Sequence, residues 1–242
     1  MRVGLFDSGM GGLTVLKVLR KKYPDNDYIY YGDNLNVPYG NKSIDELKDL
    51  ADKNIRFLFK KNVDMIIIAC GTISSTCYDM IKDKYGIPIY DIISPTLAYL
   101  NKSKNENILV MATARTIESH IFSNRVKKNV YELETPELAS LIEDGQLDNI
   151  HIVLDNYLRD YVGKIDSLVL GCTHYPVIIP EIKEILGKVK IINMASMIRI
   201  PNQGNGTLDI YFGKVDDKVT INVKRILEND DVMVRLANVN SK

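Results

Sequence analysis

The sequence is poor in cysteine, in net charge and in long hydrophobic runs. Its 242 residues contain three cysteines, an odd number that is too sparse for a disulfide framework and suits a reducing compartment. Positive and negative side chains balance at 31 each, and no extended basic stripe is present that would neutralise a row of phosphates. No segment is long and apolar enough for a signal peptide or a membrane span. We therefore expect free thiols, a cytoplasmic location, and neither nucleic acid nor membrane as a partner.

Short apolar runs alternate with longer amphipathic stretches, which is the pattern of strands and crossover helices in a mostly parallel sheet. Because strands covered on both faces read as continuous apolar runs, 64–70 and 167–171 are expected near the sheet centres. The sequence predicts an α/β fold, and its length allows one large domain or two small ones. The expected strands are 2–6, 27–32, 64–70, 87–93, 107–112, 130–134, 167–171, 189–193 and, as a possible ninth, 208–212.

Helices are expected between these strands. Ser43 and the glutamate three residues later have the spacing of a capping box, and apolar residues repeat behind them at helical spacing, so a helix is predicted over 43–60. Two more are predicted over 12–22 and 74–85. Cys77 lies within the last of these and is interpreted as a packing residue.

The two halves of the chain resemble each other weakly. Strand, cysteine, threonine and helix follow one another at 65–80 and again at 167–186, as in a duplicated α/β unit. Segments 94–106 and 201–206 are rich in polar and turn residues, which makes them candidates for crossings between two lobes. The first lobe would contain residues 1–93 and 207–242, and the second would contain residues 94–206.

Two cysteines occupy matched positions. Cys70 and Cys172 each end an apolar run just before a helix, and the carboxyl ends of strands are where α/β proteins place their chemistry. A helix amino terminus can lower the pKa of a thiol and make it a better base. A single cysteine is often an inert packing residue, but two in matched positions favour a function. Thiols facing each other across a cleft could remove a proton from one face of a carbon and supply one to the other, so we interpret the chain as a two-base enzyme.

Two polar residues are candidates to assist the thiols. His174 follows Cys172 by two residues and titrates near neutrality, so it could exchange the thiol's proton or merely hold the loop. Asp7 ends the first strand, where it could orient a base or cap the helix at 12–22. Zinc is a further alternative, but Cys-x-His lacks the paired spacing of zinc sites, and no metal is expected.

The turn at 7–14 contains three glycines and opens a helix, so its backbone N–H groups could bind a carboxylate or a phosphate. Thr14 occupies the third glycine position of the dinucleotide fingerprint, and no lysine lies where a P-loop needs one, which disfavours nucleotide binding.

His120 and His151 have no nearby partners in the sequence and are given no role. Smaller polar clusters, each also compatible with a turn or a cap, are Pro38-Tyr39-Gly40, Thr113 with Thr116, and Glu143.

Several motifs together resemble the glutamate racemases of the aspartate/glutamate racemase superfamily. They occur in order from residue 7 to residue 176, and the Gly-Cys-Thr-His-Tyr-Pro stretch is distinctive of that family. The motifs are Asp7-Ser8-Gly9, Gly32-Asp33, Val37-Pro38-Tyr39-Gly40, Ala69-Cys70 and Leu170-Gly171-Cys172-Thr173-His174-Tyr175-Pro176.

The resemblance implies two pseudosymmetric lobes, each a mostly parallel sheet flanked by helices, with the active site between them. It implies interconversion of L- and D-glutamate without a cofactor, in which Cys70 acts on the D-enantiomer and Cys172 on the L-enantiomer. Asp7 would assist the first thiol and His174 the second, with Glu143 nearby. It also implies a homodimer and a role in supplying D-glutamate for peptidoglycan, hence in cell-wall biogenesis and cell shape. The implied substrate-binding residues are Ser8, Pro38, Tyr39, Gly40, Gly71, Thr72, Thr113, Thr116 and Thr173.

The sequence also departs from this family. Its members usually carry asparagine after the first cysteine, whereas this chain has Gly71, which removes a side-chain hydrogen bond to the substrate and would widen the pocket beside Cys70. Segments 193–195 and 209–214 also differ from the usual acidic and Thr-Gly-Asp-like motifs. Two alternatives therefore stay open: a racemase for aspartate or another amino acid, and a non-catalytic amino acid binding protein that kept the cleft.

Overall fold

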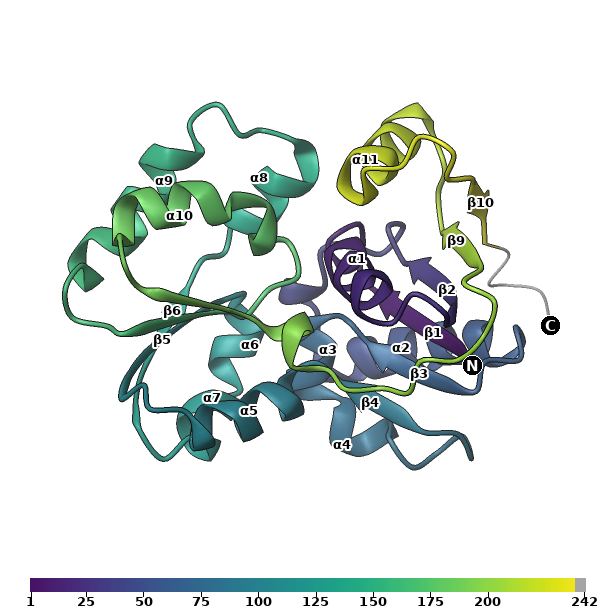
Figure 1. Cartoon of the computed structure of the whole chain (residues 1–242), viewed down its shortest axis with the longest axis horizontal. Coiled ribbons are helices and arrows are strands. Elements are labelled where there is room, and N and C mark those ends of the chain that lie inside the picture. Colours follow the sequence, from purple (N-terminus) through teal and green to yellow (C-terminus); the bar gives the residue numbers. More distant parts are fainter. Residues whose placement is uncertain (238–242) are drawn as a thin grey trace.

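The chain folds into two lobes, each built on a parallel β-sheet, in the computed structural model, which describes residues 1–237 (Figure 1). The six-stranded sheet has the order β10-β9-β2-β1-β3-β4, and the four-stranded sheet has the order β6-β5-β7-β8. The first contains β1 (Arg2–Asp7), β2 (Asp27–Gly32), β3 (Met65–Ile68), β4 (Ile89–Asp91), β9 (Leu208–Phe212) and β10 (Val234–Leu236). The second contains β5 (Asn107–Ala112), β6 (Asn129–Glu134), β7 (Ser167–Leu170) and β8 (Lys190–Asn193). The predicted α/β class is confirmed.

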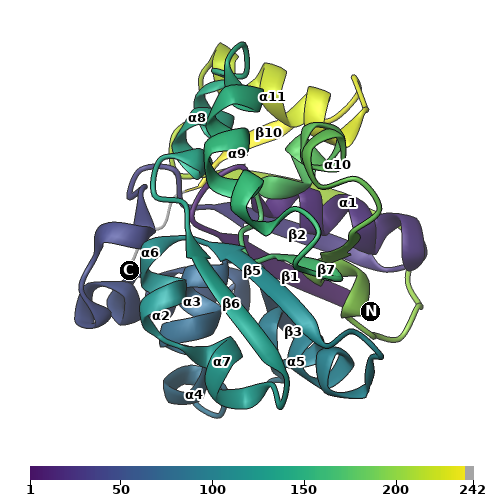
Figure 2. The ribbon, with the colours of Figure 1, turned by 90° about the vertical axis from the view of Figure 1, so that its left-hand side faces the viewer.

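Helices cover both faces of each sheet, as Figures 1 and 2 show. None of those in residues 1–237 has the length and apolar character that would let it cross a membrane. The six-stranded lobe carries α1 (Gly12–Lys22), α2 (Ile44–Phe59), α3 (Gly71–Thr76), α4 (Tyr78–Ile81) and α11 (Asp217–Leu227). Helix α5 (Ile93–Lys102) leads to the other lobe, which carries α6 (Ala114–Glu118), α7 (Ile121–Arg125), α8 (Leu138–Asp144), α9 (Ile150–Leu158) and α10 (Ile179–Leu186). Short 3-10 turns lie at Tyr39–Asn41, Arg159–Tyr161, Tyr175–Ile178 and Met194–Met197.

The two lobes share their central hydrophobic core. Side chains on alternate positions of a strand point to opposite faces of its sheet. Leu5 and Ile67 of the six-stranded sheet belong to the same buried cluster as Val110 and Val169 of the four-stranded sheet, together with residues of α1 and α5. The opposite faces form separate clusters, one with α2, α3 and α4 and the other with α8, α9 and α10. Packing within this shared cluster therefore sets the relative position of the two sheets.

Each sheet has a point at which the strand order reverses. The chain passes from β1 to β2 on one side and then to β3 on the other, and it passes from β5 to β6 and then to β7 in the same way. Ligands of open parallel sheets bind beyond the carboxyl ends of the strands at such reversals. Asp7 and Cys70 lie at the first reversal, and Thr113 and Cys172 lie at the second.

Some predicted elements differ in the structure. The helix expected over 74–85 is replaced by α3 and α4, which meet at Cys77, because hydroxyl groups of Ser75 and Thr76 donate to the carbonyl of Thr72 within the first of them. The expected crossing at 94–106 is largely α5, since Asp91 accepts hydrogen bonds from the first backbone N–H groups of that helix. The strand β10 was not predicted.

The exact lobe boundaries stay a prediction. The strands of the two sheets fall on residues 2–91 with 208–236, and on 107–193, respectively. The last five residues of the predicted first lobe, 238–242, lie outside the described part of the chain.

The capping box that begins α2 gives a prediction about stability. The Ser43 side chain accepts from the backbone N–H of Glu46, and the Glu46 carboxylate accepts from the backbone N–H of Ser43. Replacing Ser43 with alanine is expected to lower the free energy of unfolding by about 1 kcal/mol, which is about 2 to 4 °C in thermal midpoint. The control Ser43→Thr keeps the cap, so an equal loss in both variants would contradict the role of the hydroxyl.

Candidate active site

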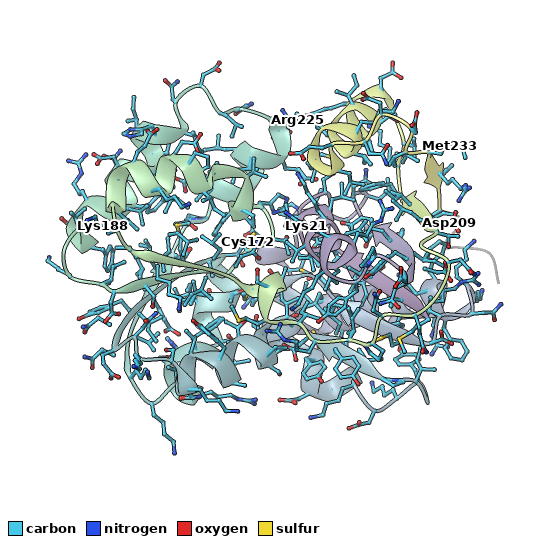
Figure 3. All side chains as sticks on the ribbon, in the orientation of Figure 1. Lys21, Cys172, Lys188, Asp209, Arg225 and Met233 are labelled. Carbon is cyan, nitrogen blue, oxygen red and sulfur yellow. The ribbon has the colours of Figure 1, made fainter. Side chains whose placement is uncertain are left out.

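A cavity of about 320 Å³ lies between the lobes and receives both predicted thiols. Figure 3 places Cys172 at the middle of the molecule, where the two lobes meet. Most of the predicted site residues line this cavity: Ser8, Pro38, Tyr39, Gly40, Cys70, Gly71, Thr72, Thr113, Glu143, Cys172, Thr173 and His174. Asp7 and Thr116 lie just behind the wall and are fully or almost fully buried.

Cys70 lies beside a buried carboxyl group. Burial raises the pKa of the Cys70 thiol, and the nearby Asp7 and Cys172 raise it further. The lowered pKa expected from the helix amino terminus is therefore wrong for this thiol, because loss of hydration outweighs the backbone N–H groups of α3. Burial also raises the pKa of Asp7, although its Oδ2 accepts from the backbone N–H groups of Gly9 and Gly12 at 3.2 and 2.9 Å. A carboxyl group with a raised pKa holds a proton more readily than a free one.

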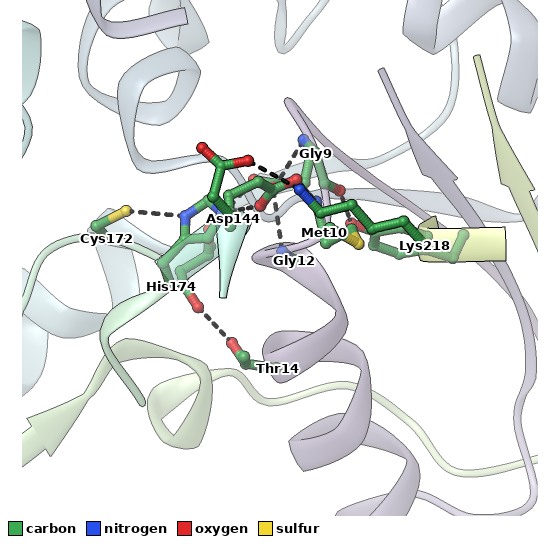
Figure 4. Close-up of polar contacts among 12 residues, drawn as sticks. Gly9, Met10, Gly12, Thr14, Asp144, Cys172, His174 and Lys218 are labelled. Carbon is green, nitrogen blue, oxygen red and sulfur yellow. Dashed lines mark hydrogen bonds and ion pairs between the residues drawn. The ribbon is translucent and has the colours of Figure 1, made fainter. Parts of the chain in front are cut away.

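Cys172 begins a chain of polar contacts that we call the Cys172 relay, formed by Cys172, His174 and Glu143. Figure 4 shows its first contact, between Cys172 and His174. The Cys172 Sγ lies 3.4 Å from His174 Nδ1, and His174 Nε2 contacts the carboxylate of Glu143. Burial alone would lower the pKa of His174, but Cys172 and Glu143 outweigh it and raise the pKa well above its ordinary value. Burial likewise opposes the charge of Glu143, but the hydrogen bond and charge of His174 lower its pKa. The relay therefore favours an imidazolium between two acidic partners.

Glycines of the first lobe allow it to contact the relay closely. The backbone N–H of Met10 donates to Glu143 Oε1 at 3.0 Å. A Cβ atom on Gly9 would lie 2.7 Å from Glu143 Oε1, and one on Gly11 would lie 2.6 Å from His174 Cε1. A side chain at either position would therefore push the lobes apart or displace the relay.

Three threonine hydroxyl groups form a row beside the cavity. Thr72 of the first lobe and Thr113 of the second have their Oγ1 atoms 3.2 Å apart. Thr116 continues the row, 3.2 Å from Thr113, and receives a longer hydrogen bond from Ser75. Thr72 and Thr113 can thus reach a ligand in the cavity, whereas Thr116 lies behind them.

Tyr39 lines the cavity with its hydroxyl group pointing away from it. That hydroxyl donates to Asp33 Oδ2 at 2.6 Å and accepts from Asn54 at 3.1 Å. Asn36 also donates to the Asp33 carboxylate. This network fixes the loop that carries Pro38 and Gly40, so any contact of Tyr39 with a ligand comes from its ring or backbone.

The sequence interpretation of Gly71 is wrong in one respect. A Cβ atom at this position would lie 2.6 Å from the carbonyl oxygen of Gly171 in the other lobe, and it would not point into open space. The absence of a side chain therefore brings the two backbones together beneath the thiols, and it does not widen the pocket. Real Cβ atoms do not approach a backbone oxygen this closely.

Some lining residues were missed from the sequence, namely Val37, Asn41, Ala114, Pro136, Ala139, Ser140, Asp144 and Gly171. Ser140 and Asp144 lie on α8 near Glu143, and helical spacing around Glu143 was the signal that could have identified them. Among the lining residues there is no lysine or arginine. Residues 1–237 contain no cluster of three or more His, Cys, Asp or Glu side chains suited to a metal ion.

Comparison with known proteins defines the family. Residues 14–198 match the model of the Asp/Glu/Hydantoin racemase family. The sequence is 34% identical to the glutamate racemase of Aquifex pyrophilus over 242 aligned residues, which cover 95% of each chain. It is 42% identical to the glutamate racemase of Fusobacterium nucleatum subsp. nucleatum over 203 aligned residues, which cover 80% of this chain and 76% of that one. The chain belongs to the Asp/Glu/hydantoin racemase family and, within it, to the glutamate racemases, which are isomerases.

Solved structures agree with this assignment. The glutamate racemase of Aquifex pyrophilus superposes with a TM-score of 0.85 over 98% of both chains, at 34% identity. That of Francisella tularensis subsp. tularensis SCHU S4, solved in complex with D-glutamate, superposes with a TM-score of 0.87 over 100% of this chain and 98% of that one, at 28% identity.

The contact between Gly71 and Gly171 gives a prediction about stability. Gly71→Ala is expected to lower the free energy of unfolding by about 1 to 3 kcal/mol, because the added Cβ overlaps a backbone oxygen. Gly40→Ala is the matched control, since its Cβ would lie at an ordinary 3.7 Å from Thr113. Chemical denaturation of both variants measures the difference. Equal stability of the two would show that the lobes can separate here without cost.

The Cys172 relay gives a prediction about pH. Because folding raises the pKa of His174, its positive charge stabilises the folded protein fully below the ordinary pKa of 6.5. This stabilisation is progressively lost at higher pH. Because folding lowers the pKa of Glu143, its negative charge stabilises the folded protein fully above the ordinary pKa of 4.5. This stabilisation is lost at lower pH. The decrease in thermal midpoint caused by Glu143→Gln should therefore be largest between pH 4.5 and 6.5.

The matched control for this variant is Glu184→Gln. Glu184 lies 3.8 Å from His151 in an exposed pair, and such pairs contribute little to stability. A flat pH dependence for Glu143→Gln, or one equal to that of the control, would contradict the ion pair.

Proposed function

We propose that this protein interconverts L- and D-glutamate by transferring protons at the α-carbon between two thiols. The observation that carries the proposal is that Cys70 and Cys172 follow strands of different sheets and line one cavity. Each is close enough for its charge to affect the other, since Cys172 contributes to the raised pKa of Cys70. The cavity volume lies at the lower end of the range for small-molecule sites, which suits an amino acid.

In the direction from L- to D-glutamate, the thiolate of Cys172 removes the α-proton. The C–H bond breaks, an S–H bond forms on Cys172, and the electron pair stays on the α-carbon. The thiol of Cys70 then gives its proton to the opposite face of that carbon, which leaves Cys70 as the thiolate. The reverse direction uses the same steps with the two thiols exchanged, and no cofactor is needed.

The neighbours of each thiol support these steps. The His174 imidazolium stabilises the thiolate of Cys172 and can return a proton to it, while Glu143 holds the imidazole ring. Both residues also line a larger neighbouring cavity of about 560 Å³, through which water can exchange protons with the relay. Asp7, whose pKa is raised by burial, can return a proton to the thiolate of Cys70, and its negative charge favours the protonated thiol. The two sides thus use different acids.

Neutral donors would bind the two carboxylates of glutamate. The lining residues include the hydroxyl groups of Ser8, Thr72 and Thr113, and the backbone around Gly40 and Thr173. Hydroxyl and backbone N–H donors can hold a carboxylate without a lysine or arginine, as helix amino termini do for other anions.

Three further proposals follow from the family. D-Glutamate made by this enzyme would supply peptidoglycan synthesis and thereby cell-wall biogenesis and cell shape. The enzyme would act in the cytoplasm as a homodimer. These remain predictions that cell fractionation, D-glutamate auxotrophy of a deletion strain and the mass of the protein in solution would test.

The experiment for the main proposal is incubation of the protein with L-glutamate in deuterated water. We expect D-glutamate with deuterium at the α-carbon. Cys70→Ser and Cys172→Ser should each lower turnover by roughly 100-fold or more, as loss of a general acid or base does. Cys77→Ser is the matched control, because Cys77 is also buried but does not line the cavity.

Failure of the wild-type protein to form D-glutamate or to exchange the α-hydrogen would refute the proposal. A panel of other L-amino acids, aspartate included, analysed by chiral chromatography would then identify a different substrate. Glutamate binding without exchange would instead indicate a non-catalytic binding protein.

A further inference from the structure

Thr173, the residue between Cys172 and His174, is held by the first lobe from two sides. Thr14, in the first turn of α1, donates from its Oγ1 to the carbonyl oxygen of Thr173 at 2.7 Å. The hydroxyl group of Thr173 donates to Asp7 Oδ1 at 3.5 Å, a longer contact. Both hydrogen bonds are buried, and both cross from one lobe to the other.

The carbonyl of Thr173 needs this partner because the local backbone does not provide one. In the 3-10 turn at Tyr175–Ile178, the N–H of Tyr175 donates to the carbonyl of Cys172, and the N–H of Val177 donates to that of His174. The residue that would serve Thr173 in the same pattern is Pro176, which has no N–H. A buried carbonyl without a donor costs free energy comparable to a lost hydrogen bond.

We infer that Thr14 is a positioning residue for Cys172. Its hydroxyl group fixes the peptide of Thr173, and this peptide sets how the Cys172 thiol and the His174 ring face each other. The thiol of the second lobe is thereby aligned by the lobe that carries Cys70 and Asp7. This inference rests on the two-thiol reaction proposed above, in which Cys172 acts on L-glutamate.

The test is Thr14→Val, which replaces the hydroxyl group with a methyl group of similar size. Loss of one buried hydrogen bond of this kind should lower kcat by about tenfold. Racemisation is then measured with L- and with D-glutamate carrying deuterium at the α-carbon. In this variant, proton transfer at Cys172 should become slower than transfer at Cys70. The primary deuterium isotope effect on kcat should therefore rise with L-glutamate as substrate and fall with D-glutamate as substrate.

Two controls separate alignment from stability. Thr14→Ser keeps the hydroxyl group and should retain the wild-type isotope effects. Thr96→Val removes another buried hydroxyl group, which donates to the carbonyl of Ile92 at 2.9 Å at the start of α5, away from the cavity. It should lower stability without changing the ratio of the two isotope effects. Should Thr14→Val not fold, Thr14→Ala carries the same measurement.

The outcomes distinguish this inference from the proposed function. Absence of α-hydrogen exchange by the wild-type protein would refute the two-thiol reaction itself. An active wild-type protein whose Thr14 variant shows an unchanged ratio of isotope effects, or the same change as Thr96→Val, would overturn the role of Thr14 and leave the reaction intact.

Discussion

The placement of the two thiols depends on the hydrophobic core that both sheets share. Apolar side chains of β1 and β3 pack in the same cluster as those of β5 and β7, together with residues of α1 and α5. Protein interiors are close-packed, so displacing one sheet would open voids or cause overlaps. Reactions at a single carbon require accurate placement of the reacting groups, since displacing one of them by about 1 Å can reduce the rate by two orders of magnitude. The core therefore fixes the distance across the cavity as well as stabilising the fold.

The scaffold is close to symmetric, but the surroundings of the two thiols are not. Each thiol follows an interior strand at the point where the strand order reverses. On one side the neighbour is Asp7, a buried carboxyl group held by backbone N–H groups of its own turn. On the other side His174 and Glu143 form an ion pair that reaches back to the first lobe through Met10. The two thiols, at equivalent strand ends, thus have different acids beside them, which suits the proposed reaction, in which each thiol acts on a different enantiomer.

The sequence predicts the parts of the fold and site that follow from regular spacing. Apolar residues mark nine of the strands, whereas Val234–Leu236 of β10 is short, mostly exposed and has an arginine at its centre, so no such pattern marks it. The polar residues near Asn101 indicate a crossing between lobes, but the segment forms α5. The start of this helix depends on hydrogen bonds to the Asp91 carboxylate. Cysteines at strand ends pointed to the cavity, since the carboxyl ends of parallel strands share one edge. The contact of Gly71 with Gly171 and the hydrogen bond from Thr14 to Thr173 depend on packing between distant segments, which no local pattern encodes.

The path of the chain has a consequence for how the protein folds. The four-stranded sheet is built from one continuous stretch, whereas β9 and β10 of the other sheet come from the opposite end of the chain and pair beside β2. The contact between Asp27 and Thr207 spans 180 positions. Closing so long a loop is entropically costly, and such pairings form late. A ribosome-bound chain can thus complete the second lobe while the first still lacks its edge, and the molecule acquires its final shape when the last strands dock.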